Sequence, residues 1–207
     1  GVQHDFLKYY KENNCNIDSF TNNTSLNSEL CLSSFTRNTD RSRRSNHNIN
    51  RNTISNILDD KIYIAKNKYS TTDYFKNIGK FKFVICPEGN GIDTHRLWET
   101  LYSKGIPIVE NNMEMRKKLE HLPIIWTYDY SEITADYLEE QYQIILNTKY
   151  DFSYLLLSFY GSKKKREIYE RSKHWCFKKN LGDFFNNYYS TLSIPIINKP
   201  NVIDKTS

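Results

Sequence analysis

The segment Phe81–Val109, with the sequence FKFVICPEGNGIDTHRLWETLYSKGIPIV, constrains the fold of this chain more than any other. Its first residues, FKFVI, form a short apolar run that the residues PEG stop, a pattern typical of a strand covered on both faces. The apolar residues that follow recur at the spacing of one helical face: Leu97, Trp98, Leu101 and Tyr102. The run IPIV then begins a second strand, so the segment predicts a β-α-β unit.

The turn of this unit carries polar residues that suit a binding site. The pair Asn90-Gly91 permits positive φ, Asp93 is expected to cap the following helix, and Gly105 is expected to end it. In open α/β sheets, ligands bind at the carboxyl ends of the strands. Six polar side chains gather at this end of the unit: Glu88, Asn90, Asp93, His95, Arg96 and Glu99.

Strand and helix patterns alternate along most of the chain. Strands are predicted at 30–35, 61–65, 81–86, 106–109 and 123–128. Further helices are predicted from TRNTDRSRR to about Leu58, around 74–78 behind a cap at 70–73, and at 114–121, 131–146, 152–159 and 163–177. This alternation predicts an α/β fold, a Rossmann-like parallel sheet flanked by helices. We expect a polar, partly disordered segment at 1–28 with a short helix near Phe6, a Rossmann-like domain at 29–187, and an irregular tail at 188–207.

The charge of the chain is mildly basic. A length of 207 residues with 38% hydrophobic residues suffices for one large domain or two small ones, and the net charge is +5. Basic residues cluster at Arg37–Arg51 and Lys163–Lys179. These clusters could face phosphates, nucleic acid or an acidic membrane surface, or they could be ordinary solvated helix faces, which we favour for the second cluster.

The cysteines do not suggest a metal site or a disulfide framework. The four of them, Cys15, Cys31, Cys86 and Cys176, lie far apart without a CxxC pair or metal-ligand spacing. We expect Cys31 and Cys86 to be small buried hydrophobes. No signal peptide and no run of about 18 apolar residues occurs. The sequence begins with Gly rather than Met, as a piece of a longer protein would, so localisation stays open.

The glycine turn matches neither of the common phosphate-binding motifs. Neither GxGxxG nor GxxxxGK[ST] is present. A helix start after Asn90-Gly91 still offers free N–H groups and a positive helix end to an anion, and Arg96 could add a bidentate phosphate contact. Glu99, one turn further, could accept hydrogen bonds from two sugar hydroxyls. The alternative is a capped helix whose Arg96 and Glu99 are solvated or pair locally.

The block CPEGNGIDTHRLWETLYSKGIPIV resembles the donor-binding signature of exostosin-like glycosyltransferases, in which a strand, a G-x-G turn and D-x-x-R-x-W-E precede a helix and an IPIV-type strand. The segments LPIIWTYDYSEIT and ELCLSSFTRNTDRSRR also resemble that family, although each is weak alone. Together the resemblance extends over most of residues 29–146. It implies the C-terminal, nucleotide-sugar-binding half of a GT-B glycosyltransferase, which would transfer a hexosyl or glycuronosyl group.

By this resemblance, Glu99 would hold the ribose hydroxyls and Arg37 or Arg41 would reach the phosphates. The implied donor-binding set is Arg37, Arg41, Glu88, Asn90, Gly91, Asp93, His95, Arg96 and Glu99. A nucleotide diphosphate sugar would be the substrate, with no metal and no other cofactor. The implied partners are a glycan or glycoprotein acceptor and an acceptor-binding half or partner subunit; no nucleic acid is expected.

The chain departs from the family pattern at two positions and in one larger respect. Lys104-Gly105 stands where Gly-Cys is usual before the IPIV strand, and Glu88 stands where many members have Arg. A carboxylate beside a diphosphate is unfavourable unless it faces the sugar or pairs with Arg96 or a lysine. The acceptor-binding half, roughly 100–150 residues at usual domain sizes, does not occur in this sequence, so no catalytic residue is named. Two alternatives therefore stay open: a non-catalytic nucleotide- or glycan-binding module, and, less favoured, a nucleic-acid-binding protein.

Overall fold

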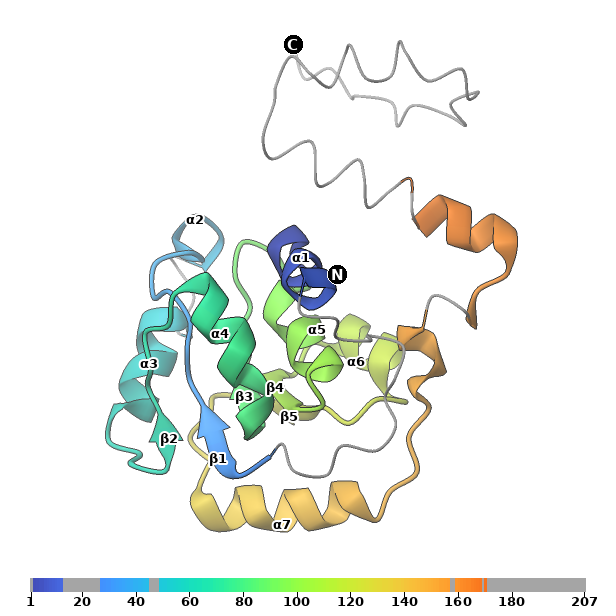
Figure 1. Cartoon of the computed structure of the whole chain (residues 1–207). Helices are drawn as coiled ribbons and strands as arrows, with labels where there is room; N and C mark the ends of the chain where they lie inside the picture. Colours follow the sequence, from blue (N-terminus) through green and yellow to red (C-terminus); the bar gives the residue numbers. More distant parts are fainter. Residues whose placement is uncertain (1, 13–26, 45–48, 157–158, 169, 171–207) are drawn as a thin grey trace, which may run out of the picture. The chain divides into compact units, whose positions relative to one another are not determined.

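The computed structural model describes residues 2–12, 27–44, 49–156, 159–168 and 170 (Figure 1). The chain divides into two compact units, Gly1–Phe159 and Tyr160–Ser207. In the second unit, residues 162–168 and 170 are helical, and the rest of the helix predicted at 163–177 lies outside the described residues. The first unit carries all the strands of the described residues and the predicted site.

The first unit is built on a five-stranded, all-parallel sheet with the order β2-β1-β3-β4-β5. Its strands are β1 (Glu29–Leu32), β2 (Ile64–Ala65), β3 (Phe81–Ile85), β4 (Ile106–Glu110) and β5 (Ile125–Thr127). All five lie within a residue or a few of the predicted positions, so the predicted α/β fold with a Rossmann-like parallel sheet is confirmed. The strand order reverses between the neighbours β1 and β3, which makes their carboxyl ends the switch point of the sheet.

Helices cover both faces of this sheet (Figure 1). On one face pack α1 (His4–Glu12), α4 (Thr71–Asn77), α5 (His95–Tyr102) and α6 (Met113–Leu119). On the other pack α3 (Arg51–Asp59) and α7 (Ala135–Leu146). Along β3 and the residue after it, Val84 and Cys86 point to the first face, and Phe83 and Ile85 to the second. Because both faces are covered, β3 is apolar except at Lys82 instead of alternating with polar residues.

The loops and helix ends differ from the sequence-based expectations at several places. The single helix expected to run to Leu58 is two helices, α2 (Arg41–Arg44) and α3, and Asn50 caps the second by accepting from Thr53 N. Helix α7 begins four residues later than expected, where Thr134 accepts from Tyr137 N. Within the closing helix expected at 152–159, the structure has a short 3-10 turn, η2 (Phe152–Leu155), and residues 157–158 lie outside the described residues. A second 3-10 turn, η1 (Ile78–Lys80), follows α4.

Helix α5 ends in a motif that puts a lysine where glycine is usual. Gly105 N donates to Thr100 O at 2.9 Å and Lys104 N to Leu101 O at 3.0 Å, the two bonds of a Schellman motif. The left-handed residue of the motif is Lys104, with φ 66°, whereas Gly105 has no positive φ. The prediction that Gly105 ends the helix is therefore wrong by one residue. Gly105 is needed for another reason: a Cβ there would lie 3.0 Å from Thr100 Cγ2.

The N-terminal helix α1 is anchored on the first face by one aromatic side chain. Phe6 is fully buried and packs edge-on against Phe75 of α4, with ring centroids 5.2 Å apart. The Phe6 ring also lies against the Tyr102 ring of α5, with ring centroids 6.5 Å apart. The short helix expected near Phe6 is confirmed.

Candidate functional site

The candidate site lies at the carboxyl ends of β1 and β3, on either side of the switch point. The loop after β1 leads through residues 33–40 into α2, and the loop after β3 leads through residues 86–94 into α5. Since β1 and β3 pair directly, with Leu32 opposite Val84, these two loops are neighbours. The sheet topology thus joins the basic cluster near Arg41 to the glycine turn.

Three arginines tie these two loops together, and the sequence reading did not select any of them. Arg43 donates from Nε to Gly89 O and from Nη2 to Glu88 Oε2, both at 2.7 Å. Arg51 donates from Nε to Glu88 O and from Nη2 to Pro87 O, both at 2.9 Å. A Cβ on Gly89 would lie 3.0 Å from Arg51 Nη2, so any larger residue there would press on the guanidinium. We name Arg43, Arg44 and Arg51 the arginine clasp.

Glu110, at the end of β4, is the carboxylate on which this clasp is centred. Its Oε1 accepts from Arg44 Nη1 at 2.6 Å, and its Oε2 accepts from Glu88 N at 2.9 Å. The hydroxyl of Tyr130 donates to the same Oε2 at 3.1 Å. One largely buried carboxylate therefore connects α2, the glycine loop and the segment after β5.

Tyr130 holds an unusual backbone conformation beside this carboxylate. It is fully buried with φ 66°, and its N–H donates to Thr127 Oγ1 at 3.0 Å. A bulky residue with positive φ is a strained conformation that the surrounding contacts must impose. Burial, and then the carboxylate of Glu110, raise the pKa of the Tyr130 hydroxyl, so it stays a donor at neutral pH.

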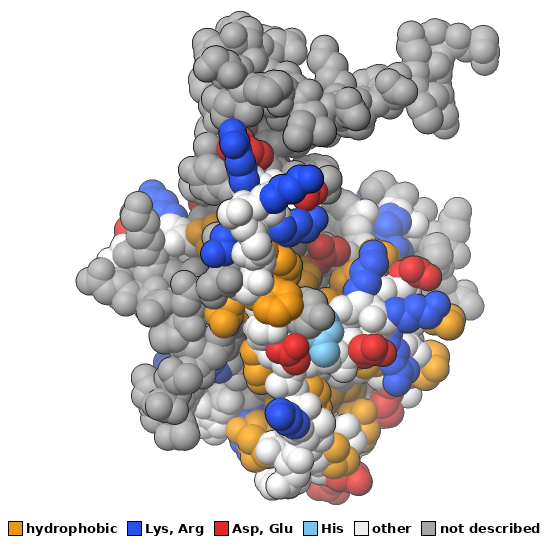
Figure 2. All heavy atoms as spheres, turned by 90° about the vertical axis from the view of Figure 1, so that its right-hand side faces the viewer, with side chains coloured by type: hydrophobic (Ala, Val, Ile, Leu, Met, Phe, Trp, Pro, Cys, Tyr) orange, Lys and Arg blue, Asp and Glu red, His pale blue; other side chains and the backbone are white. Residues whose placement is uncertain are grey.

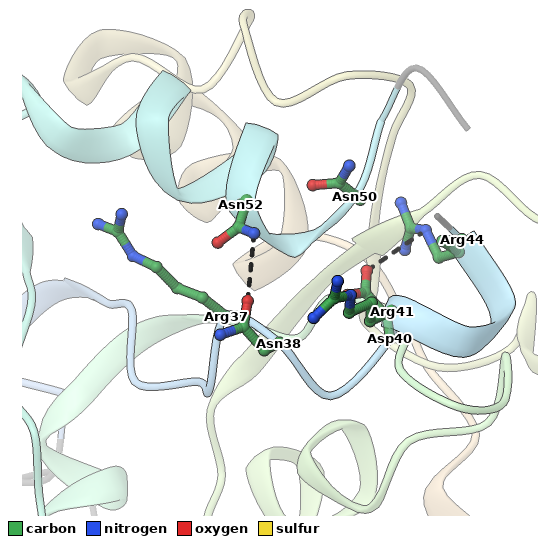
Figure 3. Close-up of a pocket in the computed structure, with 7 residues that line it drawn as sticks. All are labelled: Arg37, Asn38, Asp40, Arg41, Arg44, Asn50 and Asn52. Carbon is green, nitrogen blue, oxygen red and sulfur yellow. Dashed lines mark hydrogen bonds and ion pairs between the residues drawn. The ribbon is translucent and has the colours of Figure 1, made fainter. Parts of the chain in front are cut away.

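A polar cavity of about 470 Å³ opens between the loop after β1 and the start of α3 (Figure 3). It is lined by Arg37, Asn38, Asp40, Arg41, Arg44, Asn50 and Asn52. Arg41 is exposed, has no ion-pair partner among the described residues, and points in Figure 3 toward the side of the cavity where Asn38 lies. The guanidinium of Arg37 forms an ion pair with Asp59, in which Nη2 lies 3.2 Å from Oδ1. Of the two arginines predicted for the phosphates, Arg41 is thus the available one.

The glycine turn differs from its predicted geometry. Neither Asn90 nor Gly91 has positive φ, and the helix cap is Thr94, whose side chain makes no cap hydrogen bond. The prediction that Asp93 caps α5 is wrong, because its Oδ1 accepts from Trp98 Nε1 instead. The turn is closed by Gly89 N, which donates to Gly91 O at 3.1 Å.

Of the other residues predicted at this turn, four are exposed to solvent and one contacts the arginine clasp. Asn90, Gly91, Asp93 and His95 are exposed. Glu88 is half-buried and pairs with Arg43. The sequence predicted that a carboxylate at this position would be unfavourable next to a diphosphate unless it faced the sugar or its charge were paired. The charge is paired, although the partner is Arg43 instead of Arg96 or a lysine.

Arg96 lies in the first turn of α5 with an unsatisfied donor. Its guanidinium lies over the Tyr74 ring, 5.3 Å from the centroid, and its buried Nε has no hydrogen-bond partner in the described part of the chain. The buried Thr94 Oγ1 is also without a partner there. A buried polar group left unpaired costs about 1–3 kcal/mol, so two of them at one helix start favour a site that a ligand or water completes.

The charge of Arg96 also acts on the clasp. Burial, and to a smaller extent the like charge of Arg96, lower the pKa of Arg51 to about 10. Arg51 therefore stays protonated at neutral pH.

Glu99, expected to face the ligand, is buried beneath the N-terminus of the chain. Its residue is 3% exposed, and Oε1 accepts from Gln3 N at 3.3 Å. Burial raises the pKa of its carboxyl group, while the charge of Arg96 and the Gln3 hydrogen bond oppose that rise. The structure thus brings Glu99 and Arg96 together on α5, on the face that α1 covers.

The buried cysteine closest to the site is not a nucleophile. Cys86 follows β3 directly and is buried, as predicted, and so is Cys31. Burial raises the pKa of the Cys86 thiol to about 12, although the contact with Thr100 opposes this. A neutral thiol neither attacks nor ligates, so Cys86 acts in packing.

The residues that the structure describes also bear on metal binding, membrane spanning and surface charge. Among them, no group of three or more His, Cys, Asp or Glu side chains is placed to hold a metal ion. No described helix has the length and apolar character needed to cross a bilayer. On the described part of the face in Figure 2, Lys and Arg side chains are interspersed with Asp and Glu instead of forming one cationic surface.

The residues that the sequence reading missed share a feature that periodicity does not reveal. Arg43, Arg44 and Arg51 lie in the basic cluster that was recognised, yet only contacts with carbonyl groups and carboxylates distinguish them from Arg41. Glu110 could have been suspected, since it is a charged residue directly after the apolar run IPIV. A carboxylate at the end of a buried strand needs a partner.

Comparison with known proteins adds no relative to this description. No protein-family model matches the chain, and a search of the curated proteins finds no match. The resemblance to exostosin-like glycosyltransferases therefore stays a prediction from the residues themselves.

Proposed function

We propose that this chain is the donor-binding domain of a glycosyltransferase, with a nucleotide diphosphate sugar held at the glycine turn and α5. The observation that carries the proposal is the place of the Asn90–Glu99 block. It follows the carboxyl end of a central parallel strand, next to the switch point, where ligands of such sheets bind. Arg96 and Glu99, the two residues of the block with the chemistry for a diphosphate and a diol, lie one turn apart on α5.

The charges of the site support a diphosphate as the bound anion. Arg43 and Arg44 are neutralised by Glu88 and Glu110, and Arg37 by Asp59. Arg41 and Arg96 have no ion-pair partner among the described residues, which leaves two guanidinium groups for phosphate oxygens. The start of α5 adds backbone N–H groups and the positive end of the helix.

The proposed reaction uses this positive potential on the leaving group. The bond between the sugar anomeric carbon and the diphosphate oxygen breaks, and the oxygen of an acceptor hydroxyl bonds to that carbon. Negative charge develops on the departing nucleoside diphosphate, so prearranged guanidinium and N–H donors lower the barrier. The hydroxyl proton passes to a base, which we assign to no residue of this chain.

The proposal is tested by thermal unfolding with nucleoside diphosphates. Uridine and guanosine diphosphates are compared with the corresponding nucleosides and with inorganic diphosphate. A ligand at 100 times its Kd stabilises the folded state by about 2.7 kcal/mol. We expect one nucleoside diphosphate to raise the Tm of the wild type and to have no effect on Arg96→Ala.

A matched control separates the site from charge in general. Arg37→Ala removes an arginine whose guanidinium is already paired, so it should respond to nucleotide like the wild type. If no nucleoside diphosphate raises the Tm of the wild type, the proposal is wrong. If binding occurs without donor hydrolysis or transfer, including with an acceptor-binding partner present, the non-catalytic binding module is the better description. Binding of nucleic acid that weakens steeply with salt, without any nucleotide effect, would support the remaining alternative.

A further inference from the structure

We infer that the N-terminal strap, residues 2–12 with helix α1, competes with the nucleotide for Glu99 and so regulates access to the site. The inference rests on the proposed function, because it takes Glu99 as the group that binds the ribose diol. It adds that the described structure is the closed form of that site.

The strap makes a direct contact with the carboxylate. The backbone N–H of Gln3 donates to Glu99 Oε1 at 3.3 Å, and Glu99 is 3% exposed. A diol held by a carboxylate donates one hydroxyl to each oxygen. Gln3 therefore occupies one of the two acceptor positions that the ribose would use, and the strap covers the approach.

Among the side chains of the strap that the structure describes, Phe6 is the one that is fully buried. Tyr9 and Val2 are partly buried against the same cluster, and the Tyr9 ring lies 5.8 Å from that of Phe75 between centroids. Asp5, Leu7, Lys8 and Glu12 are exposed. Burying one aromatic side chain contributes about 1.5–3 kcal/mol, and the strap adds no strand to the sheet, so we expect it to open locally while the sheet stays folded.

The chemistry of Glu99 and Arg96 favours replacement of the strap by a nucleotide. The Gln3 bond joins a neutral donor to a carboxylate whose burial raises its pKa. Arg96, one turn earlier, keeps a buried Nε without a partner in the described part of the chain. A nucleotide would supply hydroxyl donors to Glu99 and phosphate acceptors to Arg96, whereas the strap satisfies only Glu99. Because strap and nucleotide use the same carboxylate, each must weaken the binding of the other.

The test compares nucleotide affinity among proline variants of the full chain by calorimetry. Gln3→Pro removes the N–H that reaches Glu99 and keeps Phe6 in place. Asp5→Pro is the matched control, since it places proline in the first helical turn, where the N–H has no intrahelical partner. With uridine or guanosine diphosphate as the probe, we expect Gln3→Pro to bind about 5-fold more tightly than the wild type, within the usual size of coupling between sites. Asp5→Pro should bind with the wild-type affinity.

A second measurement follows the strap itself. Hydrogen exchange of the backbone amides of residues 3–12 is measured with and without saturating nucleotide. We expect at least a several-fold faster exchange in the bound state, because the strap leaves Glu99. Phe6→Ala weakens the anchor by another route and should also raise the affinity, even if Gln3→Pro disturbs the helix.

The outcomes separate this inference from the function on which it rests. If no variant binds a nucleoside diphosphate, the proposed function is overturned and the inference falls with it. If nucleotide binds but Gln3→Pro and Phe6→Ala bind no more tightly than the wild type, and exchange in the strap is unchanged or slower, the strap does not compete and only the inference is overturned.

Discussion

At the residue scale, two arginine–carboxylate ion pairs, Arg44–Glu110 and Arg37–Asp59, differ in burial. The side chains of Arg44 and Glu110 are 4% and 11% exposed, whereas those of Arg37 and Asp59 are 49% and 45% exposed. Removing one partner of a buried pair leaves an uncompensated charge and costs about 3–5 kcal/mol, while an exposed pair contributes about 0–1 kcal/mol.

The first prediction follows from this difference. We expect Glu110→Gln to lower the free energy of unfolding by about 3 kcal/mol, the lower end of that range, because Asp40 remains 3.7 Å from Arg44 Nε. Asp59→Asn should lower it by less than about 1 kcal/mol. Urea unfolding of both variants measures the two values. Equal effects would mean that Glu110 does not organise the arginine clasp.

The second prediction concerns the pH dependence contributed by Glu99. Burial raises the pKa of its carboxyl group above the ordinary value of 4.5, so the folded state disfavours the charged form. A raised carboxyl pKa gives stability below the unfolded pKa, and that stability is lost as the pH rises through the folded pKa. Glu99→Gln should therefore be more stable than the wild type at pH 7 and lose this advantage below about pH 4, near the unfolded pKa. Thermal unfolding across this pH range measures it, and an advantage that does not change with pH would contradict the assignment.

At the element scale, the end of α5 accounts for the position of Gly105, which lies one residue later than the glycine of the exostosin-like pattern. The left-handed position of the motif is occupied by Lys104, where the resembling family has glycine, and Gly105 packs against Thr100 and Phe81. A left-handed conformation costs a residue with a side chain about 1–2 kcal/mol.

The third prediction tests this division of roles. Lys104→Gly should raise the free energy of unfolding by up to about 1 kcal/mol, since the relief of strain is partly offset by the greater freedom of glycine in the unfolded chain. Gly105→Ala should lower it by about 1–3 kcal/mol, because its Cβ would lie 3.0 Å from Thr100 Cγ2 and 3.4 Å from Phe81 O. Denaturant unfolding distinguishes the two, and a stabilising Gly105→Ala would contradict the described packing.

Local sequence patterns were sufficient to predict most helices and strands, but not the residues at which the helices begin and end. The runs FKFVI and IPIV predicted β3 and β4 because a strand covered on both faces is mostly apolar. Ser70 predicted the start of α4 because a cap acts on its own next turn, whereas the helix predicted from residue 131 starts only after the cap Thr134. Asp93 failed as a cap because Trp98, a residue outside the capping pattern, binds its carboxylate. Arg44 and Arg51, at the end of α2 and the start of α3, contact a loop some forty residues away, and a local pattern does not contain such contacts.

At the scale of the whole molecule, the parallel sheet brings distant segments into one site. The pairing of β1 with β3 places the basic cluster beside the glycine turn, and the end of β4 adds Glu110. The sequence predicted that the glycine turn follows a strand of a parallel sheet and that Arg96 and Glu99 lie on the helix after it. It could not predict which arginines are paired, or that α1 covers Glu99, because both depend on tertiary contacts between separate elements.

The most direct test of the account is calorimetric binding of a ribonucleoside diphosphate and its 2′,3′-dideoxy analogue to the wild type and to Glu99→Ala. The two ligands share the base and the diphosphate and differ only in the diol assigned to Glu99. We expect the wild type to bind the ribonucleotide at least about 10-fold more tightly, a difference of 1.4 kcal/mol, and Glu99→Ala to bind both alike. An equal affinity of the wild type for both ligands, or a preference that survives in Glu99→Ala, would contradict the proposed donor site.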